Sequence, residues 1–136
     1  MATNCPTSQP CTILVVDDDE AMRQLLVDAL TEQGCRVKMA QSGNEALDIL
    51  TEVRPNLIVT DLHMPDGGFP YLRLLQERAH STPIVVMTAY GDGQSKAKAL
   101  ECGAKAYFEK PLPITHLKAL VSQMCFLNPC GNVPPL

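Results

Sequence analysis

Short apolar segments alternate along this chain with segments whose apolar residues recur at helical spacing. The pattern predicts strands at residues 13–16, 35–40, 57–60, 84–87 and 106–108, and helices at residues 20–33, 44–50, 71–78, 95–102 and 115–126. Parallel strands need crossover connections, and strands that are apolar throughout need cover on both faces. The alternation therefore predicts an α/β fold in which a five-stranded parallel sheet carries helices on both faces.

Capping and stop signals support several of these helix boundaries. Asp19 and Ser42 precede predicted helices and are typical N-cap residues. Pro70 suits the first turn of the helix that follows it, while Gly34 and Gly103 come directly after helical segments. We therefore assign Asp19 to a helix cap rather than to a binding site.

Length and composition favour one soluble domain. The chain has 136 residues, of which 46% are hydrophobic, enough to form a core. Its net charge of −4 argues against direct binding of nucleic acid. No apolar run approaches the ~18 residues of a membrane span, and no secretion signal is present, so we expect a cytoplasmic protein that does not enter the membrane. We expect a flexible leader over residues 1–11, the domain over 12–127, and a tail or the start of a linker over 128–136.

Six cysteines are the one unusual feature of the composition. They stand at positions 5, 11, 35, 102, 125 and 130, with no C-x-x-C spacing, which argues against a structural zinc site. Without an export signal, reduced thiols are the expected state. A redox role or a disulfide between the terminal cysteines remains the alternative.

Polar residues stand at the carboxyl ends of four predicted strands. Asp17 and Asp18 follow the first strand, Asp61 follows the third, Thr88 follows the fourth, and Lys110 lies just beyond the fifth. In doubly wound sheets, ligands bind outside the carboxyl ends of the strands. We therefore expect these five side chains to share one edge of the sheet.

The three aspartates in this set predict a magnesium site. Two carboxylates about 5 Å apart repel each other by roughly 3 kcal/mol at an effective dielectric constant of about 20, so such a cluster calls for a cation. Oxygen ligands suit Mg²⁺, and a carboxylate beside the metal can attack a phosphoryl group. Lys110 would then neutralise phosphate oxygens, and Thr88 would donate a hydrogen bond to one of them.

Four segments together resemble the successive motifs of the response-regulator receiver domain of two-component signalling. They read VVDDDEAMRQLL, LIVTDLHMP, VVMTAYGD and GAKAYFEKP, and the resemblance covers roughly residues 11 to 127. It implies a flavodoxin-like doubly wound sheet with strand order 2-1-3-4-5. It also implies a signalling protein rather than an enzyme.

The resemblance implies a role for each residue of the acidic cluster. Asp61 would be the phosphoacceptor, with Asp17 and Asp18 completing the acidic pocket. Asp18, the Asp61 carboxylate and the main-chain carbonyl of His63 would hold Mg²⁺, and Asp17 would act through water.

Further roles follow from the same resemblance. Thr88 and Lys110 would contact the phosphoryl group. Tyr107 would be the switch aromatic, turning inward when Thr88 is drawn toward the phosphoryl group. The peptide bond between Lys110 and Pro111 would be cis.

Two rings are expected at the rim of the pocket, where water would approach the phosphorylated aspartate. His63 and Tyr90 take the positions two residues after the phosphoacceptor and two after the threonine. We expect both rings to shield the phosphoryl group from water. A general-base role for His63 is the alternative.

One segment departs from the family pattern. The family usually continues from Met64-Pro65 with a short loop that ends in Asp-Gly before an apolar helix, whereas this chain continues DGGFPYLRLLQ. The shape of the loop over residues 66–71 is therefore not predicted.

A phosphatase of the haloacid-dehalogenase type is the competing hypothesis, with Asp17 as its nucleophile. Asp17-x-Asp19 after a strand resembles the first motif of those enzymes, but Glu20-Ala21-Met22 replaces the usual Gly-Thr, and the chain has no room for a cap domain. A module that acts without phosphorylation is disfavoured because the acidic set is complete.

The receiver hypothesis also implies partners. A sensor histidine kinase or phosphotransfer protein would donate the phosphoryl group, and a downstream protein target or a missing output domain would receive the signal. Neither nucleic acid nor membrane is expected as a direct partner of this domain. A phosphorylation-dependent dimer is an open alternative.

Overall fold

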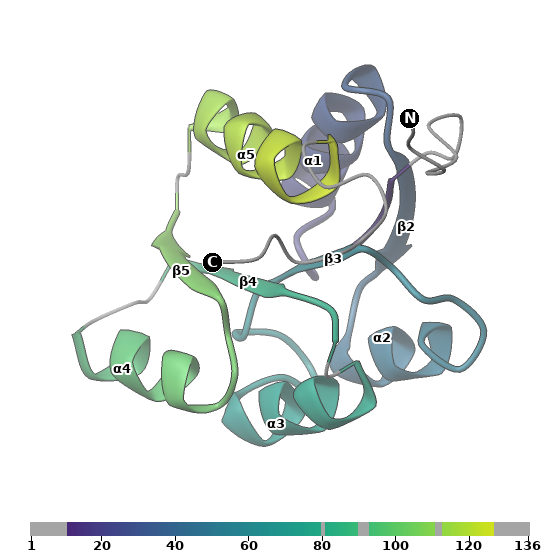
Figure 1. Cartoon of the computed structure of the whole chain (residues 1–136). Coiled ribbons are helices and arrows are strands. Elements are labelled where there is room, and N and C mark those ends of the chain that lie inside the picture. Colours follow the sequence, from purple (N-terminus) through teal and green to yellow (C-terminus); the bar gives the residue numbers. More distant parts are fainter. Residues whose placement is uncertain (1–10, 80, 90–92, 111–112, 127–136) are drawn as a thin grey trace, which may run out of the picture.

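Five parallel strands form a single sheet in this computed structural model, which describes residues 11–79, 81–89, 93–110 and 113–126 (Figure 1). The strand order is β2-β1-β3-β4-β5, as predicted. The strands are β1 (Thr12–Val16), β2 (Arg36–Ala40), β3 (Leu57–Thr60), β4 (Ile84–Thr88) and β5 (Ala106–Glu109). Every neighbouring pair is parallel, so each connection crosses over the sheet, and the predicted fold class is confirmed.

Helices cover both faces of the sheet. They are α1 (Glu20–Glu32), α2 (Gly43–Ile49), α3 (Phe69–Arg78), α4 (Gly93–Glu101) and α5 (Ile114–Val121), with a π turn, η1 (Ser122–Phe126), after the last. Figure 1 shows α1 and α5 on one face, and α2, α3 and α4 on the other. The single helix predicted for residues 115–126 is therefore wrong in its last turn, where the backbone widens from α to π geometry.

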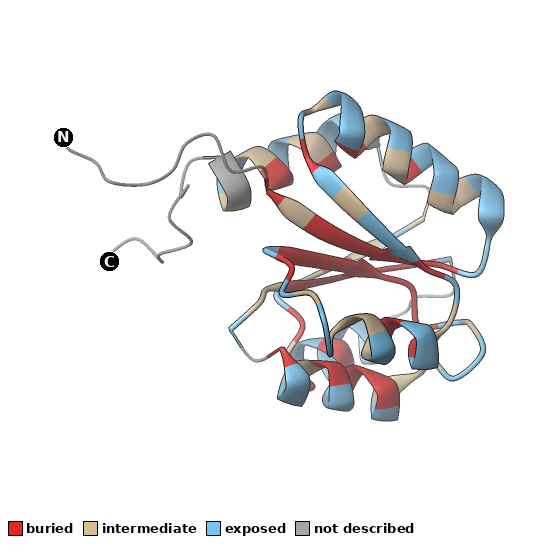
Figure 2. Cartoon of the chain, turned by 90° about the vertical axis from the view of Figure 1, so that its right-hand side faces the viewer, coloured by how far each residue is buried: buried red, intermediate tan, exposed pale blue. Residues whose placement is uncertain are grey.

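The central strands are buried on both faces, as Figure 2 shows in red. Alternate residues of β1 serve two separate cores. Leu14 and Val16 join the core under α2, α3 and α4, whereas Ile13 and Val15 join the core under α1 and α5. This two-sided burial explains why the strand is apolar throughout.

β2 is an edge strand and is the least buried of the five. Arg36, Lys38 and Met39 are exposed, and only Ala40 is fully buried. Charged side chains on an exposed edge hinder pairing with a strand of another molecule. The mixed composition of this segment therefore follows from its place at the end of the sheet.

Three of the predicted boundary signals act as expected. Asp19 accepts a hydrogen bond from the Met22 N–H at 3.2 Å and caps α1. Ser42 caps α2 by accepting from the Glu45 N–H, also at 3.2 Å. Gly34 ends the first helical segment with a φ of 101°, a left-handed conformation that glycine adopts without a Cβ clash.

The cysteines differ in state. Cys35 and Cys102 are free, buried thiols, as expected. Cys11 is disulfide-bonded, so the prediction of reduced thiols is wrong at this position.

Some predictions fall on parts of the chain outside the described residues. These are most of the leader, the tail over residues 128–136, the rim residue Tyr90 and Pro111 of the expected cis peptide. Among the described residues, no helix is both long and apolar enough to cross a membrane.

Candidate functional site

Three aspartates meet at the carboxyl ends of β1 and β3. The Asp17 N–H donates to the Ala40 carbonyl at 3.1 Å, and the Asp61 N–H donates to the Val16 carbonyl at 2.9 Å. These bonds continue the hydrogen bonding of the sheet one residue beyond the strands. The backbone positions of Asp17 and Asp61 are therefore fixed by the sheet itself.

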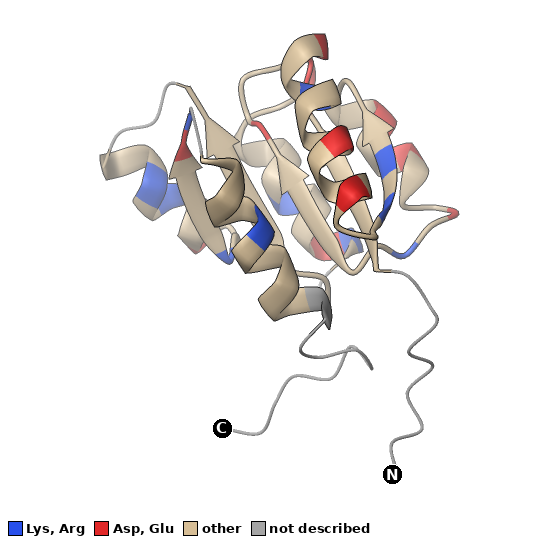
Figure 3. Cartoon of the chain, turned by 90° about the horizontal axis from the view of Figure 1, so that it is seen from above, with Lys and Arg blue, Asp and Glu red and all other residues tan. Residues whose placement is uncertain are grey.

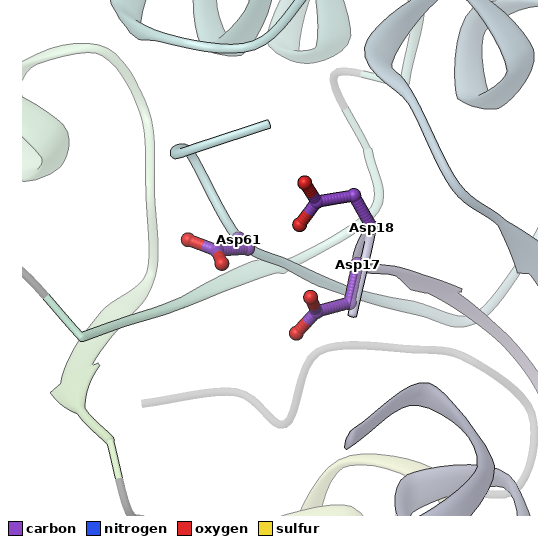
Figure 4. Close-up of side chains that lie close together, drawn as sticks. All are labelled: Asp17, Asp18 and Asp61. Atoms are coloured by element: carbon purple, nitrogen blue, oxygen red, sulfur yellow. The ribbon is translucent and has the colours of Figure 1, made fainter. Parts of the chain in front are cut away.

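Asp17, Asp18 and Asp61 lie close together, and the carboxylates of Asp17 and Asp18 extend toward the side on which Asp61 lies (Figure 4). One oxygen of each lies within 4.8 Å of the corresponding oxygen of the other two. Asp17 and Asp61 are buried, whereas Asp18 is exposed at the mouth of the cluster. The predicted acidic residues are thus brought together, with one carboxylate open to solvent.

Lys110 provides the positive charge inside this acidic cluster. Its Nζ lies 2.6 Å from Asp17 Oδ2 and 3.0 Å from Asp61 Oδ2. The backbone N–H of Lys110 donates to the Thr88 carbonyl at 2.9 Å, which fixes the backbone of Lys110 beside β4. Three carboxylates and one ammonium leave a formal charge of −3 + 1 = −2, which one divalent cation would balance.

Burial and the ion pairs shift the pKa values of this pair. Burial raises the pKa of Asp17, and the hydrogen bond from Lys110 offsets this only in part. Burial by itself would lower the pKa of Lys110, but hydrogen bonds and charge interactions with Asp17 and Asp61 outweigh burial, so the pKa is raised. Lys110 is therefore charged at neutral pH.

Backbone donors hold the Asp61 carboxylate in one orientation. Its Oδ1 accepts hydrogen bonds from the Leu62 N–H at 2.6 Å and from the His63 N–H at 3.1 Å. Its Oδ2 faces Lys110. The two oxygens are therefore chemically different, because one is bound by backbone N–H groups and the other by the Lys110 ammonium.

The donor set fits Mg²⁺. All three candidate side-chain ligands are carboxylates, and hard oxygen ligands suit Mg²⁺ better than they suit softer transition metals. The exposed position of Asp18 also leaves the cluster accessible to water, several molecules of which Mg²⁺ usually retains.

The remaining predicted residues lie around this cluster. Thr88 ends β4 and is buried. Tyr107 pairs with Val86 in the sheet and belongs to the core under α2, α3 and α4. Only 8% of its surface is exposed. Tyr107 is therefore largely buried in this structure. His63 is exposed and reaches the cluster through its backbone N–H.

The loop whose shape the sequence left open closes on itself and rests on α2. The Gly68 N–H donates to the Leu62 carbonyl at 2.9 Å, and the Gly43 N–H donates to the Pro65 carbonyl at 3.1 Å. Asp66 has a φ of 59°, which is unusual for a residue other than glycine. A Cβ on Gly43 would lie 2.0 Å from the Asp66 carbonyl oxygen, so the close seating of the loop requires glycine there.

Sequence reasoning missed three polar side chains beside the cluster. Arg23 donates from its guanidinium to the Asp17 carbonyl at 2.8 Å. Thr60 donates to the Asp61 carbonyl at 2.8 Å, and the Tyr71 hydroxyl lies 2.9 Å from the Thr60 hydroxyl. A threonine in an otherwise apolar strand, directly before the candidate phosphoacceptor, was the available signal for the last two.

Comparison with known proteins agrees with this geometry. The family model described as the response regulator receiver domain matches residues 13–122. The response regulator MprA of Mycolicibacterium vanbaalenii is 39% identical over 111 residues, which make up 81% of this chain and 48% of MprA. The DNA-binding transcriptional regulator NtrC of Klebsiella pneumoniae is 36% identical over 110 residues, or 80% of this chain and 24% of NtrC. The chain thus spans less than half of the length of these relatives.

A solved structure extends the likeness to three dimensions. The CheY-like response regulator receiver domain protein of Methanospirillum hungatei matches with a TM-score of 0.81 at 26% identity, over 85% of this chain and 93% of that one. The family match extends over most of the chain, and the parallel sheet has the same order that the resemblance implies. This chain therefore belongs to the response regulator receiver family of two-component signalling.

Proposed function

We propose that this receiver takes a phosphoryl group from a sensor histidine kinase or a phosphotransfer protein onto Asp61, with Mg²⁺, and switches a protein-interaction surface in response. The observation that carries the proposal is the setting of Asp61. Its carboxylate is fixed by two backbone N–H groups, lies beside two further carboxylates, and contacts the partly buried ammonium of Lys110.

The two oxygens of Asp61 suit different parts in the transfer. Oδ2 would attack phosphorus as the bond from phosphorus to the donor's imidazole nitrogen breaks, and the electron pair of that bond returns to the nitrogen. Oδ1 would become the carbonyl oxygen of the acyl phosphate while keeping its two N–H donors. Lys110 would leave the carboxylate for the incoming phosphoryl oxygens, which carry more charge.

Asp18, the Asp61 carboxylate and the main-chain carbonyl of His63 would hold Mg²⁺, with Asp17 acting through water. The ion would supply positive charge next to the transferred phosphoryl oxygens. Lys110, whose ammonium contacts Asp17 and Asp61, would supply part of this positive charge.

Thr88 and Tyr107 are the proposed switch residues. Because Tyr107 is already largely buried, phosphorylation would act as a population shift that restricts the ring to a buried position. Moving such an equilibrium from 1:99 to 99:1 takes about 5.5 kcal/mol, which a phosphoryl group bound by Lys110 and Thr88 could supply.

The switch would act through a protein partner or an output domain. The chain matches less than half of MprA and NtrC, and we propose that a separate target protein or an output domain carries the response. Figure 3 shows lysine and arginine on several separate elements of the described chain, which supports a protein partner rather than nucleic acid for this domain. We place the protein in the cytoplasm, where such kinases phosphorylate their partners, and a phosphorylation-dependent dimer is one form the output could take.

Intact mass after treatment with acetyl phosphate and Mg²⁺ tests the proposal. The wild-type protein should gain one phosphoryl group, and Asp61→Asn should gain none, because the amide keeps the shape but is no nucleophile. Asp66→Asn, which alters an exposed aspartate in the neighbouring loop, is the matched control and should behave as wild type. A phosphoryl group that persists in Asp61→Asn would support the phosphatase hypothesis, in which Asp17 is the nucleophile.

A further inference from the structure

A buried chain of hydrogen bonds connects α3 with the backbone of Asp61. The Tyr71 hydroxyl lies 2.9 Å from Thr60 Oγ1, and Thr60 Oγ1 donates to the Asp61 carbonyl at 2.8 Å. Tyr71 and Thr60 have 3% and 1% of their surfaces exposed. A threonine hydroxyl has one proton, which the Asp61 carbonyl takes up, so Tyr71 must donate to Thr60. The direction of the chain is therefore Tyr71 to Thr60 to Asp61.

Packing alone does not explain these two hydroxyls. Tyr71 belongs to the core under α2, α3 and α4, most of whose buried members are leucine, isoleucine, valine and alanine. Burying a polar group costs free energy unless it is paired, and an apolar pair of similar shape would fill the same space. What an apolar pair would lack is the hydrogen bond to the Asp61 carbonyl.

That carbonyl belongs to the peptide group that orients the Asp61 side chain. The Asp61 carbonyl and the Leu62 N–H lie in one rigid plane. The Leu62 N–H donates to Asp61 Oδ1 at 2.6 Å, while Oδ2 faces Lys110 at 3.0 Å. A hydroxyl that fixes the carbonyl therefore also fixes the direction of the N–H, and with it the rotation of the carboxylate.

We propose that Tyr71 is a positioning residue for phosphorylation of Asp61: through Thr60 it fixes the peptide plane that turns Asp61 Oδ2 toward the incoming phosphoryl group. This inference rests on the proposed function and assigns to it a residue outside the pocket. Tyr71 acts on the reacting carboxylate only through Thr60 and the backbone.

The ring of Tyr71 is held independently of its hydroxyl. A Cβ on Gly43 would lie 2.9 Å from Tyr71 Cδ1, so the ring packs closely against the start of α2. Tyr71→Phe should therefore keep the ring in place and remove only the donor to Thr60. Thr60→Val removes the middle of the chain at nearly constant shape, and Thr60→Ser keeps the hydroxyl.

The kinetic test measures phosphorylation by acetyl phosphate at saturating Mg²⁺. We expect Tyr71→Phe and Thr60→Val each to lower the maximal rate constant about tenfold, because a rotated nucleophile reacts less often, with the half-saturating donor concentration unchanged. The double variant should be no slower than Thr60→Val, and Thr60→Ser should restore most of the rate. Thr82→Val is the matched control: it removes a hydroxyl that donates to the Pro55 carbonyl at the opposite end of the strands. It should keep the wild-type rate constant.

A second readout needs neither Mg²⁺ nor a phosphoryl donor. The short hydrogen bond of the Leu62 N–H should place its amide proton resonance far downfield in the metal-free protein, and Tyr71→Phe should move it upfield. A wild-type rate constant in Tyr71→Phe, or an unmoved Leu62 resonance, would overturn the inference alone. Wild-type protein that accepts no phosphoryl group on Asp61 would overturn the proposed function, and the inference with it.

Discussion

The Nζ atom of Lys110 lies nearer to Asp17 than to Asp61, at 2.6 Å from Oδ2 of the first and 3.0 Å from Oδ2 of the second. The ammonium is thus shared between a residue proposed to bind Mg²⁺ through water and the proposed phosphoacceptor. Any divalent cation that enters the cluster must compete with a positive charge already placed there.

Lys110→Met should therefore strengthen Mg²⁺ binding, by roughly tenfold at low salt, because it removes a charge that repels the ion. The gain should shrink as salt is added. Calorimetric titration of Mg²⁺ into both proteins measures it. Lys118→Met, which removes a lysine paired with Glu32 on α1, is the control and should bind Mg²⁺ as wild type does. Unchanged or weaker binding by Lys110→Met would mean that lysine and metal occupy separate places.

The same lysine should make stability depend on pH in the alkaline range. Burial opposes its charge, but its bonds to Asp17 and Asp61 prevail and raise its pKa above the unfolded value of 10.5. The folded protein binds the proton of Lys110 more tightly than the unfolded chain does. The resulting stabilisation is therefore fully present below pH 10.5 and is lost as the pH rises through the pKa of Lys110 in the folded protein. Urea unfolding of metal-free protein should show the difference between wild type and Lys110→Met shrinking over that range. A difference in unfolding free energy that does not change with pH would contradict the raised pKa of Lys110.

Asp18→Ala should weaken Mg²⁺ binding by at least about tenfold, because the ion loses one of its few fixed carboxylate ligands. The fold should be little affected, since Asp18 is exposed. Asp19→Ser is the control, because it removes the adjacent carboxylate but retains a side chain able to cap α1. Wild-type affinity in Asp18→Ala would mean that the ion is held by other groups.

Gly43→Ala should destabilise the fold by about 2 kcal/mol or more, because the added methyl group collides with the Asp66 carbonyl and the Tyr71 ring. Gly93→Ala is a close control: Gly93 is also the first residue of its helix, and a Cβ there meets no atom within 4 Å. Urea unfolding compares the two. Equal stabilities would show that the loop moves aside without cost.

His63→Ala should speed the loss of the phosphoryl group from Asp61. The ring is exposed beside the cluster, and we propose that it hinders the approach of water. The rate should then vary little over roughly pH 6 to 8, the range in which a histidine acting as a base would change charge. Decay followed by intact mass after removal of the donor decides it. Slower decay in the variant, together with loss of a pH dependence, would support the general-base alternative.

The strands and most helices were predictable because their periodicity reflects burial directly. β1 is buried on both faces and is apolar throughout, and the Asp19 and Ser42 caps have the short polar side chains that helix starts require. The end of α5 was not predictable, because the spacing of apolar residues is similar in an α-helix and in a short π turn.

The carboxylate cluster was predictable for a different reason. In a parallel sheet, residues that follow neighbouring strands must meet at one edge, whatever the loops do. The hydrogen bonds from Tyr71 through Thr60 to Asp61 were not predictable. They depend on how α3 packs against β3, and that packing depends on the loop around Asp66. The spacing of apolar residues in a helix predicts that a tyrosine ring is buried, but it does not predict whether the hydroxyl of that tyrosine has a hydrogen-bond partner.

Locating the phosphoryl group directly tests whether Asp61 is the phosphoacceptor. Protein treated with acetyl phosphate and Mg²⁺ can be reduced with borohydride, which converts an aspartyl phosphate to homoserine, and then digested and sequenced by mass spectrometry. We expect homoserine at position 61 and unmodified aspartate at positions 17 and 18. Homoserine at position 17, or no conversion at any aspartate under conditions in which the protein is folded and binds Mg²⁺, would contradict it.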